Sequence, residues 1–157
     1  MALSFRDALV EFTKVVGLPE LPDPLPSGLF DLELENGLLI SVFEQQEIGA
    51  AELFCEIGAY PEFAELEILG MVAKANSGFA ATGGATLGAD TTKRCITMTL
   101  RVPLVEDDPE RLSRDLPQFA ELALDWKQAI EEKISNHNGT SEDTNKPLSD
   151  SKPIRFA

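Results

Sequence analysis

Histidine is nearly absent from this chain, because His137 is the only one among its 157 residues. Cysteine is scarce too, with Cys55 and Cys95 alone. Because His137 falls in a polar C-terminal segment, neither a Ser-His-Asp triad nor a Cys-His pair is expected inside the fold. Two distant cysteines without a folded histidine also lack the spacing of a zinc site. We therefore expect no enzyme activity, no cofactor and no metal, and interpret Cys55 as a small buried apolar side chain.

Basic residues are few: the chain has 13 lysines and arginines but 27 aspartates and glutamates, which gives a net charge of −14 and a pI near 4.3. Such a charge opposes binding to the phosphate backbone of nucleic acids and to anionic membrane surfaces. A basic partner, or a neutral apolar one, is favoured instead.

Long apolar runs are also missing. No stretch approaches the roughly 18 apolar residues of a membrane span, and the first residues, "MALSFRDALVEFTKVVG", carry charges every few positions, unlike a signal peptide. We therefore expect a cytoplasmic protein with reduced cysteines and an unmodified Asn138-Gly139-Thr140 sequon.

A glycine-rich stretch between Asn76 and Ile96 invites comparison with a phosphate-binding loop. Gly83 and Gly88 have the glycine spacing of a P-loop, but Asp90 stands where the Lys-Ser/Thr pair should follow. The dinucleotide-binding G-x-G-x-x-G pattern is absent as well. The stretch therefore predicts a strand, a turn and a returning strand, over residues 84–90, 91–93 and 94–102.

The first regular element is predicted to be a helix over residues 5–16, with Ser4 as its cap and Gly17 at its end. Its apolar residues recur at helical spacing and form one stripe: Phe5, Ala8, Leu9, Phe12, Val15 and Val16. Val10 falls on the charged side instead. An exposed valine is usually without function, so Val10 is a candidate partner contact set against that simpler interpretation.

Residues 18–28 contain four prolines and predict an extended connector; a proline-rich docking ligand is the less favoured alternative. Residues 30–35 alternate apolar and acidic side chains, and Asn36-Gly37 is a strong hairpin signal. The return strand, 38–43, is apolar on both faces, as if covered on two sides. Residues 51–57 are expected to be the third strand of an antiparallel meander.

The second predicted helix, residues 61–76, has apolar residues around most of its circumference. One interpretation is an over-hydrophobic helix in a small core. The other, which we favour, is a helix shared with a second copy of the chain, because one sheet can cover only one side of a helix. The candidate dimer contacts are Leu66, Leu69, Met71 and Val72, with Leu87 from the following strand.

The strand after the glycine-rich stretch places Ile96, Met98, Leu100 and Val102 on one face, which is typical of a half-buried antiparallel strand. A final helix is expected beyond Pro117, with a kink or a fresh start near Leu116 because proline disfavours a helix interior. From Ser135 the composition becomes polar. We therefore divide the chain into a domain, residues 1–134, and a disordered tail, residues 135–157.

The order of these elements, the phrase "GGATLGADTTKRCITMTLRVPL" and a last helix "FAELALDWKQAIEE" with its tryptophan together resemble the class I chaperones of bacterial type III secretion, the Tir chaperone family. The resemblance covers roughly Leu3 to Lys133, and its motifs are fairly specific in combination. Pro117 and the long polar tail depart from the family pattern.

The resemblance implies an acidic α+β homodimer: helix, three-stranded meander, helix, β-hairpin, C-terminal helix. Such proteins lack catalytic residues, bind the non-globular N-terminal segment of a secreted effector, and keep it competent for the secretion ATPase. A non-catalytic dimeric adaptor, or a regulator of the secretion apparatus, remains open. The candidate effector contacts are Val10, Phe30, Leu32, Met98 and Leu100, with ordinary core as the alternative for the last four.

Overall fold

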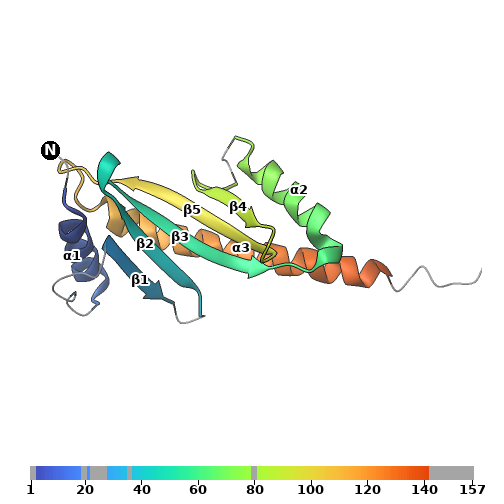
Figure 1. Cartoon of the computed structure of the whole chain (residues 1–157). Coiled ribbons are helices and arrows are strands. Elements are labelled where there is room, and N and C mark those ends of the chain that lie inside the picture. Colours follow the sequence, from blue (N-terminus) through green and yellow to red (C-terminus); the bar gives the residue numbers. More distant parts are fainter. Residues whose placement is uncertain (1–2, 19–20, 22–27, 35–36, 79–80, 142–157) are drawn as a thin grey trace, which may run out of the picture.

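The computed structural model describes residues 3–18, 21, 28–34, 37–78 and 81–141 (Figure 1). It has an α+β fold whose elements follow the expected order: α1 (Phe5–Val16), β1 (Leu29–Glu33), β2 (Leu39–Gln45), β3 (Ala50–Ala59), α2 (Glu65–Asn76), β4 (Thr86–Asp90), β5 (Cys95–Pro103) and α3 (Arg111–Ser141). Short 3₁₀ turns, η2 (Gln46–Ile48) and η3 (Glu62–Ala64), precede β3 and α2. Most of the expected proline-rich connector lies outside the described residues.

Helix α1 begins and ends where the sequence predicts. The Ser4 hydroxyl accepts a hydrogen bond from the backbone N–H of Asp7 at 3.1 Å, and Gly17 ends the helix in the left-handed conformation with φ 70°. Four residues of the predicted stripe are buried: Phe5, Ala8, Leu9 and Phe12. The other two residues of the stripe, Val15 and Val16, are 59% and 41% exposed, so the stripe is buried only over its first two turns. The last turn of α1 borders a surface groove instead.

The strands form one antiparallel sheet in the order β1-β2-β3-β5-β4. The predicted hairpin at Asn36-Gly37 is confirmed: Gly37 has φ 78°, which glycine adopts at little cost, and its N–H donates to the carbonyl of Leu34 at 2.8 Å. The second predicted hairpin, β4–β5, is confirmed as well. Strand β3 pairs with β2 on one side and β5 on the other, which joins the two hairpins into a single sheet.

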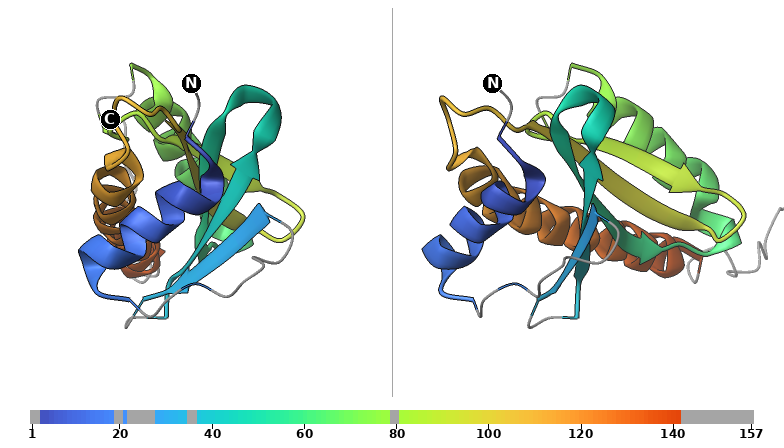
Figure 2. Two further views of the ribbon diagram at one scale, coloured as in Figure 1. Left: turned by 90° about the vertical axis from the view of Figure 1, so that its left-hand side faces the viewer. Right: turned by 60° about the vertical axis from the view of Figure 1, so that its left-hand side comes forward.

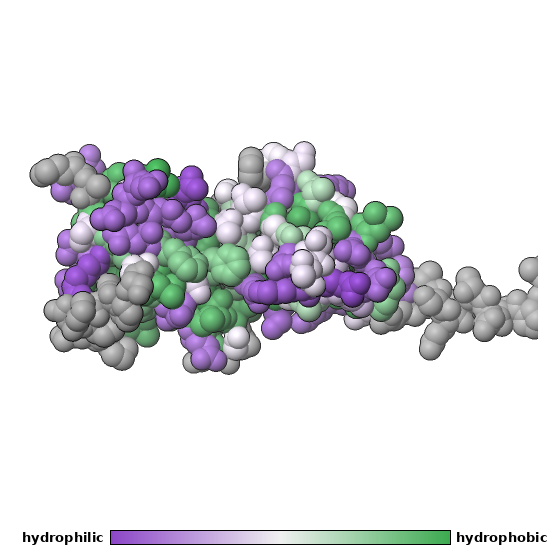
Figure 3. All heavy atoms as spheres, viewed as in Figure 1, coloured by the Kyte–Doolittle hydropathy of each residue, from purple (hydrophilic) through white to green (hydrophobic). Residues whose placement is uncertain are grey.

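The helices cover one face of this sheet and leave the other open (Figure 2). The covered face carries the core residues of β2, β3, β4 and β5: Ile40, Val42, Leu53, Cys55, Ile57, Leu87, Ile96, Met98 and Val102. On the open face Leu39 and Phe43 are 50% and 37% exposed, and Phe43 meets Phe54 edge-on with ring centroids 6.4 Å apart. The prediction that residues 38–43 are covered on both faces is therefore wrong. Figure 3, which views the open face, shows hydrophobic residues among hydrophilic ones.

Helix α3 is continuous across Pro117, so it does not start afresh near Leu116. A proline inside a helix costs about 3 kcal/mol, since it removes one backbone hydrogen bond and crowds the preceding turn. Burying one large apolar side chain contributes about 1.5–3 kcal/mol. The helix buries several on both sides of the proline, namely Leu112, Leu116, Phe119 and Ile130. Packing therefore outweighs the local penalty. Among the described residues, no helix combines the length and apolarity needed to cross a membrane.

Helix α3 continues past residue 134, where the sequence analysis divided the chain, to Ser141. The ring of His137 stacks on Phe63 with centroids 5.3 Å apart, and its Nδ1 lies 3.4 Å from a carboxylate oxygen of Glu67. Lys133 Nζ lies 3.1 Å from the other Glu67 oxygen. This part of α3 thus packs against α2 and its preceding turn. Residues 142–157 lie outside the described residues.

Removal of residues 138–157 is expected to leave folding and dimerisation unchanged. The contacts of Lys133 and His137 with α2 remain in the shortened chain, and the deleted sequence is too polar to offset its ordering entropy by burial. Melting temperatures of the full and shortened proteins, measured side by side, check this. A decrease of several degrees in the shortened protein would show that the deleted residues pack on the domain.

Candidate polypeptide-binding site

An apolar groove lies between α1, β1 and α3, with a volume of about 360 Å³. We call it the α1 groove. Its lining residues are Phe12, Val16, Leu18, Leu32, Leu34, Leu116, Pro117, Ala120 and Glu121. Glu121 alone among them carries a charge. The groove therefore suits apolar side chains much better than a charged small molecule.

The α1 groove borders the edge of the sheet. Strand β1 is the outermost strand on this side, and edge strands present backbone N–H and C=O groups that another chain can pair with. Phe30 of β1 contacts Phe12 of α1 edge-on, with ring centroids 6.3 Å apart, which holds the strand beside the helix. Leu32 follows two residues later and lines the groove. An extended peptide can thus place apolar side chains in the groove while its backbone runs along β1.

A second, smaller depression of about 240 Å³ surrounds Val10 on the other side of α1. Arg6, Thr13, Lys14 and Leu21 line it together with Leu18, which also lines the α1 groove. Val10 itself is half-buried. Because Leu18 belongs to both depressions, a single extended ligand can reach both.

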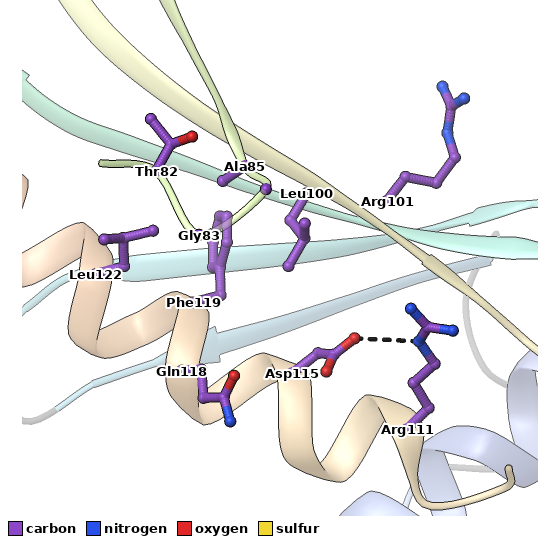
Figure 4. Close-up of a pocket in the computed structure, with 11 residues that line it drawn as sticks. Thr82, Gly83, Ala85, Leu100, Arg101, Arg111, Asp115, Gln118, Phe119 and Leu122 are labelled. Carbon is purple, nitrogen blue, oxygen red and sulfur yellow. Dashed lines mark hydrogen bonds and ion pairs between the residues drawn. The ribbon is translucent and has the colours of Figure 1, made fainter. Parts of the chain in front are cut away.

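A third cavity, of about 410 Å³, lies under the glycine-rich turn between β5 and α3 (Figure 4). We call it the turn pocket. Its lining residues come from three segments. The glycine-rich turn contributes Thr82, Gly83, Gly84 and Ala85, strand β5 contributes Leu100 and Arg101, and helix α3 contributes Arg111, Asp115, Gln118, Phe119 and Leu122. Apolar side chains thus form its inner part, and the Arg111–Asp115 ion pair, 3.3 Å between Nε and Oδ2, lies at one end.

Two hydrogen-bonded side chains hold the glycine-rich turn in place. The indole N–H of Trp126 donates to the carbonyl of Ala81 at 3.2 Å. The Asn76 side chain bonds both backbone groups of Leu87, with its amide donating at 2.8 Å and its oxygen accepting at 2.9 Å. The sequence from the turn into β5 is a strand, a turn and a strand, as predicted, and the glycines shape a pocket wall.

The predicted effector contacts divide into exposed and buried residues. Val10, Phe30, Leu32 and Leu100 are half-buried; Val10, Leu32 and Leu100 each line a cavity, and Phe30 contacts Phe12, which lines the α1 groove. Met98 is fully buried, so it is a core residue and cannot meet a partner while the domain is folded. The prediction did not include Val16 and Leu18, although both line the α1 groove. Their position at the C-terminal end of the first helix, just before the prolines, could have indicated that they lie at the surface.

The predicted dimer contacts on and near α2 also differ in exposure. Leu66 is 86% exposed, the highest value among the exposed large apolar residues of the described part of the chain. Leu69 and Met71 are half-buried and pack against the core. Val72 and Leu87 are 7% and 2% exposed. These last two side chains pack inside one protomer, so their role as intersubunit contacts stays a prediction that this single chain does not support. A partner can reach Leu66 directly.

Both cysteines are buried and free in the described structure. Burial raises the pKa of each thiol, so both are protonated at neutral pH and are poor nucleophiles. Within the described residues no cluster of three or more histidine, cysteine, aspartate or glutamate side chains is arranged to hold a metal ion. These cysteines therefore act as core side chains.

Stability is expected to fall as the pH rises through the alkaline range, because burial raises the pKa of Cys55 from 9.0 to about 11. At a pH below 9.0 the Cys55 thiol keeps its proton in both the folded and the unfolded chain. At a higher pH the thiol of the unfolded chain ionises first, which favours unfolding. Urea unfolding midpoints across this range check the effect. The Cys55→Ala variant should lose less stability than the wild type over the same pH range. Equal losses would show that ionisation of Cys55 does not cause the decrease.

No model of a known protein family matches the chain, and no curated protein matches its sequence. Solved structures do match its fold. A chain of the HopA1–SchA chaperone–effector complex has a TM-score of 0.59 at 15% identity and covers 82% of this chain and 94% of its own. A chain of the heterodimeric ExoU–SpcU complex from the type III secretion system of Pseudomonas aeruginosa has a TM-score of 0.61 at 17% identity, with coverages of 80% and 97%.

A third structure is the type III secretion chaperone SycH of Yersinia pestis in complex with a stable fragment of YscM2. It has a TM-score of 0.59 at 15% identity and covers 77% of this chain and 98% of its own. The chain therefore has the α+β fold of type III secretion chaperones, as the resemblance of the sequence predicted.

Proposed function

We propose that this protein is a type III secretion chaperone. As a homodimer in the cytoplasm, it binds the extended, non-globular N-terminal segment of a secreted effector and keeps that segment soluble and competent for secretion. The observation that carries the proposal is an exposed apolar groove beside an edge strand, in a chain with the type III chaperone fold. One of the similar structures is a chaperone–effector complex, HopA1–SchA, and another is a heterodimeric complex from a type III secretion system, ExoU–SpcU.

Binding requires no chemical step on this surface. Apolar side chains of the effector segment occupy the α1 groove and the depression around Val10, while its backbone runs along β1. Covering exposed apolar surface stabilises the complex by about 25 cal/mol per Å². Holding the segment extended prevents it from collapsing or aggregating before export, and the secretion ATPase is the further partner that would receive it.

Co-expression tests the proposal. A tagged form of this chain is produced with each larger protein encoded beside it, and the co-purifying protein is identified. The expected partner binds through its N-terminal segment, and that segment alone suffices. If a partner binds only as a folded domain, and its N-terminal segment does not bind, an adaptor or regulator takes the place of the chaperone. If no neighbouring product binds, the proposed function falls.

A charge introduced into the α1 groove or into the depression around Val10 is expected to weaken effector capture. Val10→Asp and Val16→Asp each place a carboxylate where an apolar side chain would bind, at a cost of about 1.5–3 kcal/mol, or roughly tenfold or more in Kd. Val15→Asp is the matched control, because Val15 is on the same helix, is 59% exposed and lines neither cavity. Calorimetry with the effector segment measures the affinity.

The same three variants should keep the fold and the dimer, since substitutions at exposed positions usually change stability by no more than about 0.5 kcal/mol. Val10 is half-buried, so its variant is compared with the wild type by thermal melting before binding is measured. Equal affinity in Val15→Asp and Val16→Asp would place the binding site elsewhere.

A further inference from the structure

Strand β5 extends past the end of β4. The β4–β5 pairing ends where Thr86 lies opposite Thr99, but β5 continues to Pro103 and stays paired with β3 over that length. Residues 100–103 therefore have a neighbouring strand on one side only. We call the other side, toward β4, the β5 edge. At about 3.3 Å per residue it spans roughly 10 Å.

The backbone of Arg101 faces the β5 edge. The N–H of Leu104 donates to the carbonyl of Gly49 at 2.9 Å, which is on the β3 side. Backbone groups of successive residues in a strand point to opposite sides. The N–H and C=O of Arg101 therefore point away from β3, and no strand in the described part of the chain pairs with Arg101 on that side.

Pro103 supports this orientation independently. It lies in β5 opposite Ala50, and a proline is tolerated in a strand only where its missing N–H faces no partner. By the same alternation Pro103 faces the β5 edge, as Arg101 does. The proline ends the run of backbone donors on this edge, so the edge can pair with only a short segment.

The β5 edge opens into the turn pocket. Leu100 points from β5 toward α3, and Phe119 and Leu122 point back from the helix, so the three side chains enclose an apolar volume (Figure 4). The opposite wall is the glycine-rich turn, in which Gly83 and Gly84 have φ of 56° and 89°, a backbone conformation that favours glycine.

Arg101 is among the residues that line the pocket, but its side chain extends from β5 in a different direction from that of Leu100, toward the other face of the sheet (Figure 4). Its side chain is 63% exposed, and its Nη2 forms a long ion pair with a Glu52 carboxylate oxygen at 3.8 Å, which is beyond hydrogen-bonding distance. An acidic residue directly opposite Arg101 on an added strand would therefore meet a cation with free donors. Opposite charges across a strand pair contribute roughly 0.2–1 kcal/mol.

We propose that the β5 edge and the turn pocket form a second strand-addition site, which binds a short extended segment of a partner polypeptide. The segment has an acidic residue opposite Arg101, with a large apolar residue beside it in sequence. Side chains alternate between the two faces of a strand. The acid therefore lies on the open face near Arg101, and the neighbouring apolar side chain enters the pocket against Leu100, Phe119 and Leu122. This site deepens the proposed function, on which it rests, by specifying part of the sequence that an effector segment would carry.

The test uses a synthetic probe, acetyl-Ser-Phe-Glu-Phe-Ser-amide, and amide hydrogen exchange of the full-length protein measured by NMR. In the free protein, the Arg101 N–H should exchange much faster than those of Leu100 and Val102, which pair with β3. At millimolar probe, exchange at Arg101 should slow by roughly tenfold while its neighbours change little. An Arg101 N–H that is as protected as its neighbours in the free protein would overturn the proposal.

Two matched probes and one pair of variants make the result specific. Methylating the glutamate backbone nitrogen removes the donor that faces Arg101 and should abolish the effect, whereas methylating a phenylalanine nitrogen, which faces outward, should not. Leu122→Trp fills the pocket and should prevent binding. Leu39→Trp, on the open face of β2, should not. Equal slowing with both methylated probes, or with both variants, would contradict strand addition at this edge. Because the probe is synthetic, the outcome is independent of whether an effector co-purifies.

Discussion

Met98→Asp is expected to leave no folded protein. The Met98 side chain is fully buried at the centre of the sheet, where it lies opposite Cys55 on β3 and Leu87 on β4. An unpaired carboxylate there costs several kcal/mol after relaxation. Loss of the buried methionine adds about 1.5–3 kcal/mol. Since a whole domain is stable by only about 5–15 kcal/mol, this single substitution consumes most or all of that margin.

Circular dichroism and the soluble fraction after expression measure the effect. Thr99→Asp is the matched control, because Thr99 is the next residue of the same strand and points to the open face. Its variant should remain folded and soluble. A folded Met98→Asp protein with impaired partner binding would instead show that Met98 lines a groove, and that β5 separates from its neighbours in solution.

Local signals predicted much of the fold. A cap and a glycine stop defined α1, and Asn36-Gly37 defined the first hairpin, because these features act within a few residues of the chain. Pairing of β3 with β5 was harder to foresee, since it joins residues about forty positions apart in the sequence, such as Cys55 and Met98. Nothing local specifies such a contact.

Two errors arose where packing overrides local preference. Pro117 predicted a break in the last helix, but side chains buried on either side hold the helix together. The apolar return strand, residues 38–43, predicted coverage on two faces, yet all the helices lie on one face and Leu39 remains half exposed. Hydrophobicity shows that a residue tends to be buried; it does not show whether another element is present to cover it.

Only part of the candidate site was predicted, because the sequence pattern does not show which apolar side chains other elements cover. Strand alternation identified the face that includes both Met98 and Leu100, but their exposures differ because β4 ends before it reaches Leu100. The prediction of a shared helix included both Val72 and Leu66 as dimer contacts, although the first faces the core and the second faces solvent. Only the three-dimensional arrangement distinguishes a side chain that stabilises the protomer from one that is free to bind a partner.

Leu66→Asp is expected to convert a dimer into a folded monomer. Leu66 is 86% exposed on α2, so it contributes little to the fold of one chain, but an exposed leucine on a helix with much apolar surface is well placed to meet a second copy. An unpaired carboxylate buried at that contact costs several kcal/mol, and each 1.4 kcal/mol weakens association about tenfold. Leu69→Asp is a poorer test, since Leu69 packs partly against the core and its variant would also unfold the protomer.

Light scattering at micromolar concentration measures the mass, and thermal melting shows whether the protomer stays folded. Ile48→Asp is the control: Ile48 is also a large exposed apolar residue, 55% exposed in the turn before β3, and belongs to neither α2 nor its neighbours. It should leave the dimer intact. A monomeric wild type, or a Leu66→Asp protein that remains dimeric, would move the subunit contact away from α2. The second result would keep the homodimer but assign it to another surface, and the open face with Leu39 and Phe43 would be the next to test.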